Sequence, residues 1–256
     1  MKYLLEANLT IKHSNGNLER DSYALSYILK KLCDVRKESV YNDERDTYCK
    51  DDSSSVYELE IGDIYLNLDK SLVKSQDFFR RTLYRYDWMQ VQIDKRGHVL
   101  SVNNLQYMKE QWQEIRMLLL NDYKGNCVEE YIATIDTQFM CQDMKTSMSR
   151  YFNFGLLFPL IPTDHKLNWQ NNRKIELSEF DGICFNECIM YESVESINRK
   201  YSIVGKSLSK DECVLNNYGG YIIVPHGDIH PVEAQVEIDY IKKGININWC
   251  FKIRQD

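Results

Sequence analysis

Alternation of apolar and polar residues is the strongest pattern in this chain, and it is clearest near the C-terminus. Every second residue from Val232 to Tyr240 is apolar, and the residues between them are charged or carry an amide. After a turn at 242–244, apolar residues again occupy every second position from Ile245 to Ile253. Because successive side chains of a strand point to opposite faces, this stretch predicts a β-hairpin with one buried and one solvated face.

The N-terminal part of the chain follows the same period. Residues 2–13 alternate cleanly and predict a first strand. Residues 21–33 fit either a strand or a helix, because apolar residues recur at both spacings, and we favour a strand that pairs back on the first. A polar run at 42–55 predicts a mobile loop. Alternation returns at 56–67, where Gly62 is expected at a bulge or kink of the last strand in the region 2–67.

The middle of the chain changes to a helical period. Apolar residues three and four positions apart predict a helix at 70–85, and a hairpin follows at 88–102. Two further helices are predicted within 104–149, the first of them ending near Gly125, since glycine commonly terminates helices. The connection between them is short, which predicts an antiparallel helical pair.

Residues 174–254 return to alternation and predict a second run of strands, in which Gly219 and Gly220 are expected to mark a bulge. Strands at both ends of a chain with helices between them are typical of α+β proteins. We therefore predict a single α+β domain over residues 1–256, in which a large curved antiparallel sheet wraps around a central helical pair. The low numbers of Gly and Pro residues, 11 and 4, favour one domain, because long flexible linkers are usually rich in both.

Charge and hydropathy exclude several classes of partner. The formal net charge of −6 disfavours a dedicated nucleic-acid-binding protein, because binding phosphates requires clustered Lys and Arg. No stretch approaches the roughly 18 apolar residues that a membrane-spanning helix requires. The first residues also lack the apolar centre of a secretory signal. We therefore expect the eight cysteines to be reduced and the protein to be cytoplasmic.

The motif His226-Gly227-Asp228-Ile229-His230 is the most suggestive group of titratable side chains. On a helix the two histidines would share a face and could bind one metal ion. The neighbouring Pro225 and Pro231 disfavour a helix, and an extended chain would hold the imidazoles about 13 Å apart. We expect a loop with solvated histidines, and a metal or catalytic role for His226, Asp228 and His230 is the alternative.

Other sequence signatures of catalysis are missing. Cys184 and Cys188 are separated by three residues on a predicted strand, a spacing that fits neither a redox pair nor a zinc knuckle. The chain contains no phosphate-binding loop, no dinucleotide-binding glycine motif, no nucleophile elbow and no zinc-protease motif. The sequence therefore predicts no cofactor, no metal and no catalytic residue.

The stretch 151–162 is rich in apolar residues but is interrupted by Gly and Pro, so it is not expected to form a regular helix. Such a segment either fills the open side of a curved sheet or forms an exposed contact patch for a partner or a lipid. The candidate contact residues are apolar and closely spaced, and they are Phe152, Phe154, Leu157, Phe158 and Leu160.

The hairpin at 83–99 carries the turn Ile93-Asp94-Lys95-Arg96-Gly97 and leads to Trp112 on a predicted helix. This arrangement resembles a group of uncharacterised bacterial proteins, and the resemblance implies no activity and no site residues. A curved sheet over helices also resembles the half-barrels of lipoprotein carriers, which work outside the cytoplasm.

Three functions are compatible with these patterns. The leading hypothesis is a non-catalytic cytoplasmic protein that binds another protein, such as an immunity protein or an adaptor of a secretion system. The second is a carrier that holds an apolar ligand in a cleft between sheet and helices, near Phe154, Leu157 and Phe158. The third is an enzyme that uses His226, Asp228 and His230, and it requires those side chains to converge in a pocket.

Overall fold

The structure is a computed structural model, and it combines one large antiparallel sheet with three α-helices in the part of the chain that it describes. The described residues are 1–35, 53–70, 72–140, 148, 150–151, 154–164, 167–177, 183–208 and 213–256. Most of the loop predicted at 42–55 lies outside these residues, and its last residues, Ser54 and Ser55, open a strand.

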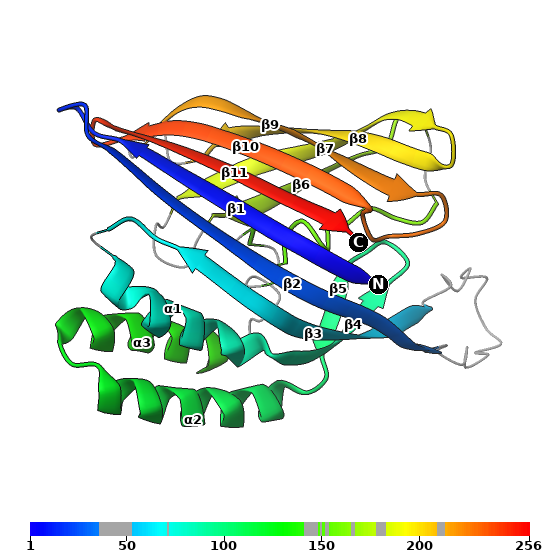
Figure 1. The fold of residues 1–256 in the computed structure, drawn as a ribbon. Coiled ribbons are helices and arrows are strands. Elements are labelled where there is room, and N and C mark those ends of the chain that lie inside the picture. The colour runs from blue at the N-terminus through cyan, green and yellow to red at the C-terminus, as the bar shows by residue number, and fades with distance from the viewer. Residues whose placement is uncertain are drawn as a thin grey trace.

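The eleven strands follow one another in space in the order β5-β4-β3-β2-β1-β11-β10-β9-β8-β7-β6 (Figure 1). Their bounds are β1 (Lys2–Lys12), β2 (Leu18–Val35), β3 (Ser54–Asn67), β4 (Trp88–Asp94), β5 (Val99–Val102), β6 (Gln170–Glu176), β7 (Cys184–Glu195), β8 (Asn198–Ser207), β9 (Val214–Pro225), β10 (Glu233–Lys242) and β11 (Ile245–Gln255).

The two ends of the chain meet at the centre of the sheet. β1 and β11 are antiparallel neighbours, with Tyr3 opposite Gln255 and Lys12 opposite Asn246 (Figure 1). Both strands direct their apolar residues to the same buried face, as the alternation predicts. The predicted C-terminal hairpin is confirmed as β10 and β11, so both ends of the chain contribute to one core.

The ambiguous segment 21–33 is a strand, and the helical alternative is wrong. It forms part of the 18-residue strand β2, which pairs with β1 on one side and β3 on the other. The register of β2 and β3 shifts between Leu25 and Tyr27, opposite the stretch from Ile61 to Ile64, and this places a bulge at Gly62 as predicted. A Cβ atom on Gly62 would lie 2.5 Å from Ser26 Oγ, so a larger residue would displace this hydroxyl from its hydrogen bond with the Asp63 N–H.

The bulge predicted at Gly219 and Gly220 is wrong. Both glycines pair regularly within β9, and the irregularity in the β9–β10 pair instead separates Asp239 from Tyr240. Gly220 is needed for close approach, since a Cβ atom there would lie 2.1 Å from the carbonyl oxygen of Gln235 on β10. Sequence alone does not separate these two uses of a strand glycine.

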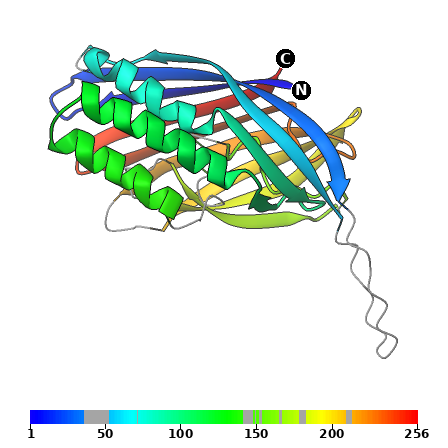
Figure 2. The ribbon, with the colours of Figure 1, turned by 90° about the horizontal axis from the view of Figure 1, so that it is seen from below.

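The helices lie together against one face of the sheet (Figure 2). α1 (Gln76–Leu83) is flanked by 3-10 turns, so the helix predicted at 70–85 is regular only at its centre. α2 (Leu105–Asp122) and α3 (Asn126–Met140) form the predicted pair, joined by a short turn at Gly125, whose φ of +123° favours glycine. The residues predicted to extend α3 toward 149 lie largely outside the described part of the chain.

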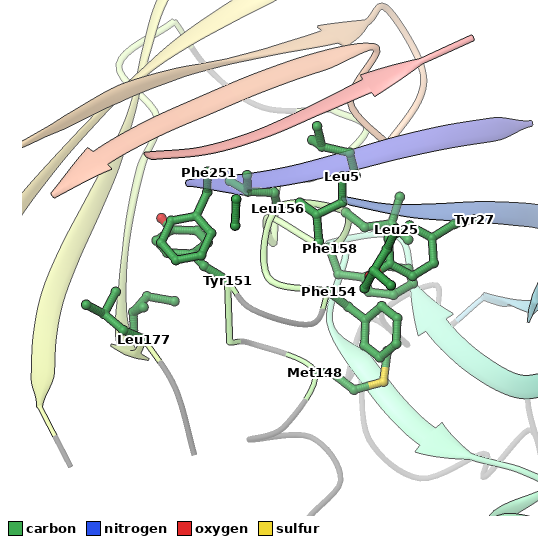
Figure 3. Packing of buried hydrophobic residues seen from close by; sticks show 14 of the residues in the cluster. Leu5, Leu25, Tyr27, Met148, Tyr151, Phe154, Leu156, Phe158, Leu177 and Phe251 are labelled. Atoms are coloured by element: carbon green, nitrogen blue, oxygen red, sulfur yellow. The ribbon is translucent and has the colours of Figure 1, made fainter. Parts of the chain in front are cut away.

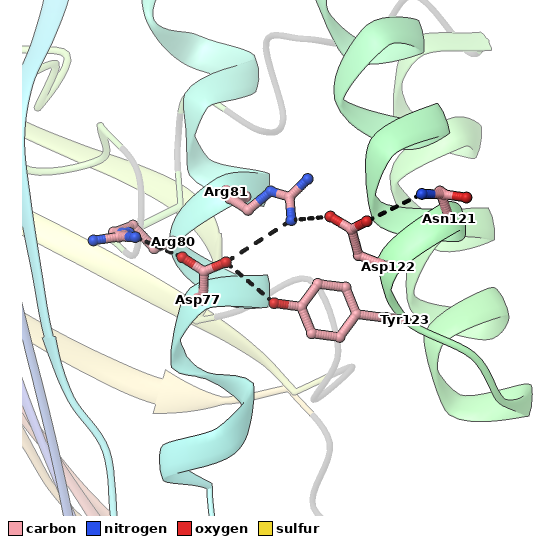
Figure 4. A network of polar contacts seen from close by, with 6 residues as sticks. All are labelled: Asp77, Arg80, Arg81, Asn121, Asp122 and Tyr123. Carbon is pink, nitrogen blue, oxygen red and sulfur yellow. Dashed lines mark hydrogen bonds and ion pairs between the residues drawn. The ribbon is translucent and has the colours of Figure 1, made fainter.

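Polar contacts join α1 to the end of α2. Arg81 Nη1 lies 2.7 Å from Asp122 Oδ2, and the Tyr123 hydroxyl donates to Asp77 at 3.2 Å (Figure 4). At the other end of α2, the Asn104 side chain does not cap the helix. It accepts from the backbone N–H of Gln90 and donates to the carbonyl of Trp88, so it ties the start of the helix to β4.

The strand order and the helices together confirm the predicted α+β class, with a curved sheet over a helical pair.

Candidate functional site

The described residues of the apolar segment 151–162, which are 151 and 154–162, lie against the buried face of the sheet. Phe154, Leu157 and Phe158 are all almost completely buried, and Leu160 is half-buried. The fifth candidate contact residue, Phe152, lies outside the described residues. Figure 3 shows side chains of this segment pointing toward the strands that carry Leu5 and Leu25.

Aromatic contacts fix this segment in the core. The ring of Phe154 lies 5.5 Å from the rings of both Tyr27 and Tyr86. Three hollows lined by described residues, one beside Tyr57, one beside Trp169 and one beside Trp112, do not include Phe154, Leu157 or Phe158 in their lining. The chain itself occupies the place where an apolar ligand of a carrier would lie, which favours the filling alternative for this segment.

A buried arginine on β6 holds the segment from one side. Arg173 Nη1 donates to the carbonyl of Gly155 at 3.0 Å and to that of Phe158 at 3.3 Å. Its Nε donates to Glu187 Oε1 on β7 at 2.7 Å, and both residues are buried. These bonds satisfy two carbonyl groups that an irregular buried segment would otherwise leave unpaired.

Glu187 belongs to a polar network that crosses adjacent strands. The Tyr218 hydroxyl on β9 donates to Glu187 Oε2 at 2.8 Å and lies 3.5 Å from the Tyr151 hydroxyl. Gly205 makes room for the Tyr218 ring, because a Cβ atom there would lie 2.4 Å from that ring. Burial raises the pKa of the Glu187 carboxyl, whereas the hydrogen bond from Tyr218 and the Arg173 guanidinium 2.7 Å away favour its ionised form.

A second buried arginine, Arg199 on β8, holds the next part of the chain. Its Nη1 donates to the carbonyls of Pro162 and Thr163 at 3.0 and 3.1 Å. Its Nη2 donates to the carbonyls of Pro225 and Asp228 at 3.3 and 2.6 Å. One guanidinium group therefore joins the interior segment to the loop that carries the histidine motif.

Neither arginine was predicted to be buried, although the strand pattern contained a signal. Arg173 precedes the buried Ile175 by two positions, and Arg199 precedes the buried Tyr201 in the same way. A charged residue in the apolar register of a strand predicts a buried partner. The sequence does not show that the partners are carbonyl groups of residues 155–163.

The three side chains of the histidine motif do not converge. His226 is exposed, whereas His230 is 2% exposed and packs against Tyr57 and Phe158. The carboxylate of Asp228 accepts from the backbone N–H groups of Ile229 and His230, so it shapes the loop. The prediction of solvated histidines is therefore correct for His226 and wrong for His230, whose environment is set by long-range packing.

Nothing in the described part of the chain assembles a metal site. No three His, Cys, Asp or Glu side chains among the described residues are grouped so that they could hold an ion. Cys184 and Cys188 are both free thiols on β7. The prediction that both cysteines lie on one strand is therefore confirmed.

The strand β6 presents an open backbone edge. It is the last strand of the sheet, and the N–H of Tyr191 donates to the carbonyl of Trp169 at 3.0 Å. In an antiparallel ladder the bonded residues alternate, so Asn171, Arg173 and Ile175 also face β7. The backbone groups of Gln170, Asn172, Lys174 and Glu176 point away from β7, and no described backbone group bonds to them.

A hollow of about 520 Å³ adjoins the start of this edge. On one side it is lined by Arg96 and His98 of the β4–β5 turn, and on the other by Trp169, Gln170 and Asn171. The two margins of the curved sheet therefore approach each other here, with residues 160–164 between them. We call this hollow the seam, and its remaining lining residues are Leu160, Pro162, Asp164 and Asn168.

The Gly97 backbone holds the turn against the interior segment. Gly97 has a φ of +79°, and a Cβ atom there would lie 3.1 Å from the backbone nitrogen of Ile161. The N–H of Thr163 donates to the carbonyl of Lys95 at 3.1 Å. This margin of the seam is therefore fixed to residues 160–163.

None of the helices in the described part of the chain combines the length and the apolar character needed to cross a membrane. Comparison with protein-family models and with curated proteins returned no match to this chain.

Proposed function

We propose that this protein is a non-catalytic binding protein that docks another protein along the open edge of β6. The observation that carries this proposal is the row of outward backbone groups at Gln170, Asn172 and Lys174, which have no backbone partner among the described residues. Such an edge pairs readily with an extended segment of another chain, because each unpaired N–H and C=O gains a hydrogen bond.

The rest of the site favours binding over catalysis. The titratable side chains of the histidine motif point to different environments, and the apolar interior is occupied by residues 154–161. A partner can therefore engage the outside of the sheet without displacing the core. β6 spans seven residues, which is close to the usual length of a strand and long enough for specific pairing.

Lys174 makes the edge selective. Edge strands that avoid indiscriminate pairing commonly carry an exposed lysine, whose charge opposes association with apolar strands. Lys174 is exposed on β6, so a partner strand gains from an acidic residue opposite it. The edge is then available to a partner with matching charge and unfavourable for random aggregation.

The proposed role is that of an immunity protein or of an adaptor in a secretion system, acting in the cytoplasm. The free thiols of Cys33, Cys127 and Cys250 support a reducing compartment. The overall charge of −6 favours a partner with a basic surface elsewhere in the interface.

The test is an Asn172→Pro variant in a comparative pull-down from lysate of the source cells. Proline removes the N–H of Asn172, which points outward, and leaves the β6–β7 hydrogen bonds in place. We expect wild type to retain a partner and N172P to lose it at least about tenfold, with an unchanged melting temperature. The matched control, Asn171→Pro, removes an N–H that faces β7 and should lower the melting temperature.

The retained protein is then purified and mixed with wild type, and amide exchange is measured on the binary complex. Protection at Gln170, Asn172 and Lys174 on binding would support strand addition. The proposal fails if the partner binds N172P as tightly as wild type, or if wild type reproducibly retains no protein.

A further inference from the structure

The seam brings a side-chain site and the open edge of β6 together. Gln170 and Asn171 line the hollow and also begin the strand whose backbone is free. A segment that pairs with β6 therefore passes the hollow where it lies beside Gln170 and Asn171. The side chains of this segment alternate between the two faces of the sheet, so every second side chain points to the face that carries the hollow.

The floor of the seam is apolar and held in place. Leu160, Pro162 and Trp169 supply apolar surface, and the Trp169 ring packs edge-on against the buried Tyr201 at 5.7 Å. Leu160 adopts a φ of +62°, a conformation that residues other than glycine rarely take. Arg199 binds the carbonyl of Pro162, and Gly97 lies against the backbone of Leu160. The conformation of Leu160 is therefore set by its surroundings.

Two cations, one at the seam and one on the edge strand, have no carboxylate partner among the described residues. Arg96 lines the seam and Lys174 lies further along the edge, and both side chains are exposed. The neighbouring His98 is different, because its Nδ1 lies 3.1 Å from Asp94. Asp164 is the only acidic side chain among the residues that line the seam. On a protein with a net charge of −6, these cations give the edge the opposite local sign.

We infer that the seam selects an extended segment of a partner protein that carries one apolar side chain flanked by acidic residues. The inference rests on the proposed strand addition and adds its specificity. The partner backbone pairs with Gln170, Asn172 and Lys174, its apolar side chain contacts Leu160 and Trp169, and its carboxylates lie beside Arg96 and Lys174. An isolated peptide of this pattern should bind without the rest of the partner.

The experiment is a selection from a displayed library of random peptides, each about eight residues long so that it can span one edge strand. Three forms of the full chain serve as bait. Wild type is compared with Asn172→Pro, which lacks an edge donor, and with the charge reversal Arg96→Glu combined with Lys174→Glu. Wild type should enrich an apolar residue between Asp or Glu residues, whereas the charge-reversed bait should enrich Lys or Arg in their place.

The variant Leu160→Gly tests the floor separately from stability. Glycine accepts the φ of +62° without strain, so the fold should be retained while the apolar side chain is lost from the seam. We expect the melting temperature to stay near that of wild type. The affinity for a selected peptide should fall about tenfold, and the preference for an apolar residue should disappear.

The outcomes separate this inference from the proposed function. Peptides that depend on Asn172 but show neither an apolar nor an acidic preference would overturn the inference and leave strand addition in place. If no peptide is enriched over N172P, strand addition itself fails. If the purified chain forms a dimer that N172P abolishes, the occupant of the edge is a second copy of this chain, and the inference is wrong.

Discussion

Arg173 and Glu187 place two opposite charges inside an apolar core. The exposed fractions of their side chains are 5% and 0%, so neither charge is hydrated. Their interaction offsets this loss of hydration only while both partners are present, because an unpaired buried charge is strongly unfavourable. Arg173 also binds the carbonyls of Gly155 and Phe158, so the pair connects the sheet to the interior segment.

We predict that Glu187→Gln and Arg173→Met each lower the free energy of unfolding by about 3 kcal/mol or more. The double variant should lose less than the sum, with a coupling of at least about 1 kcal/mol, because the second change removes an already unpaired group. Urea denaturation of the four proteins measures this cycle.

A matched surface pair provides the control for that cycle. Arg81 and Asp122 lie at the same distance of 2.7 Å, but their side chains are 25% and 45% exposed (Figure 4). Their coupling should stay below about 1 kcal/mol, since solvent screens both charges. Equal coupling in the two pairs would contradict the role that we assign to burial.

Burial of the His230 side chain makes the stability of the protein depend on pH. Burial lowers the pKa of His230 from 6.5 to about 4. Its Nε2 has no hydrogen-bond partner among the described residues, and its ring packs against Tyr57 and Phe158. The native state therefore holds this imidazole neutral at a pH where the unfolded chain already binds a proton.

The sign of the pH dependence follows from that difference. Between pH 6.5 and about 4 the unfolded state binds more protons at His230, so stability falls as the pH falls through this window. Lowering the pH from about 7 to about 5 should therefore cost wild type about 2 kcal/mol through this residue alone. In His230→Phe, which keeps the ring contacts, this contribution should vanish. Denaturation at both pH values measures it, and an equal loss in both proteins would refute it.

At the scale of elements, hydrophobic period decides strand against helix, but partners decide the ambiguous cases. The apolar residues Tyr23, Leu25, Tyr27 and Leu29 of β2 are all buried on one face. A helix over the same residues would have left β1 and β3 without the strand between them. The choice at 21–33 therefore depended on neighbours that the local pattern does not contain.

The adjacent glycines of β9 allow a sharp test of strand packing. A Cβ atom at Gly220 would lie 2.1 Å from the Gln235 carbonyl oxygen, whereas at Gly219 the nearest contact would be 3.9 Å. We predict that Gly220→Ala lowers the free energy of unfolding by at least about 2 kcal/mol, because β9 and β10 must separate locally. Gly219→Ala should change it by less than about 0.5 kcal/mol. Similar values for the two variants in urea denaturation would contradict the close approach.

At the scale of the whole molecule, the first and last strands of the chain join the two halves of the sheet at its centre. β1 pairs with both β2 and β11, and all eleven strands depend on this junction for continuity. β1 and β11 are hydrogen-bonded to a neighbouring strand on both sides, whereas each margin strand is bonded on one side only. The least protected elements should then be the margins of the sheet and not its terminal strands.

We predict that amides of β1 and β11 exchange most slowly, although they lie at the ends of the chain. In β6, Asn171, Arg173 and Ile175 should be protected, while Gln170, Asn172 and Lys174 exchange fast. Hydrogen exchange followed by nuclear magnetic resonance resolves this alternation. Rapid exchange throughout β1 would contradict its central position.

The sequence by itself determined the class of this fold and most of its elements. Alternation along 2–13 and 232–253 specifies which face of each strand is buried, and a helical period specifies α2 and α3. These properties are local, since they depend on the spacing of apolar residues within one element. They were therefore predictable without knowing any neighbour.

Only the tertiary structure decided where the candidate site lies. The open backbone of Asn172, the meeting of Arg96 with Gln170 at the seam, and the burial of His230 all arise from strand order and sheet curvature. Arg173 and Arg199 were readable as charges on buried faces, but their carbonyl partners were not. Hydrogen bonds and contacts between distant segments depend on the strand order and curvature of the whole sheet, which no local pattern specifies.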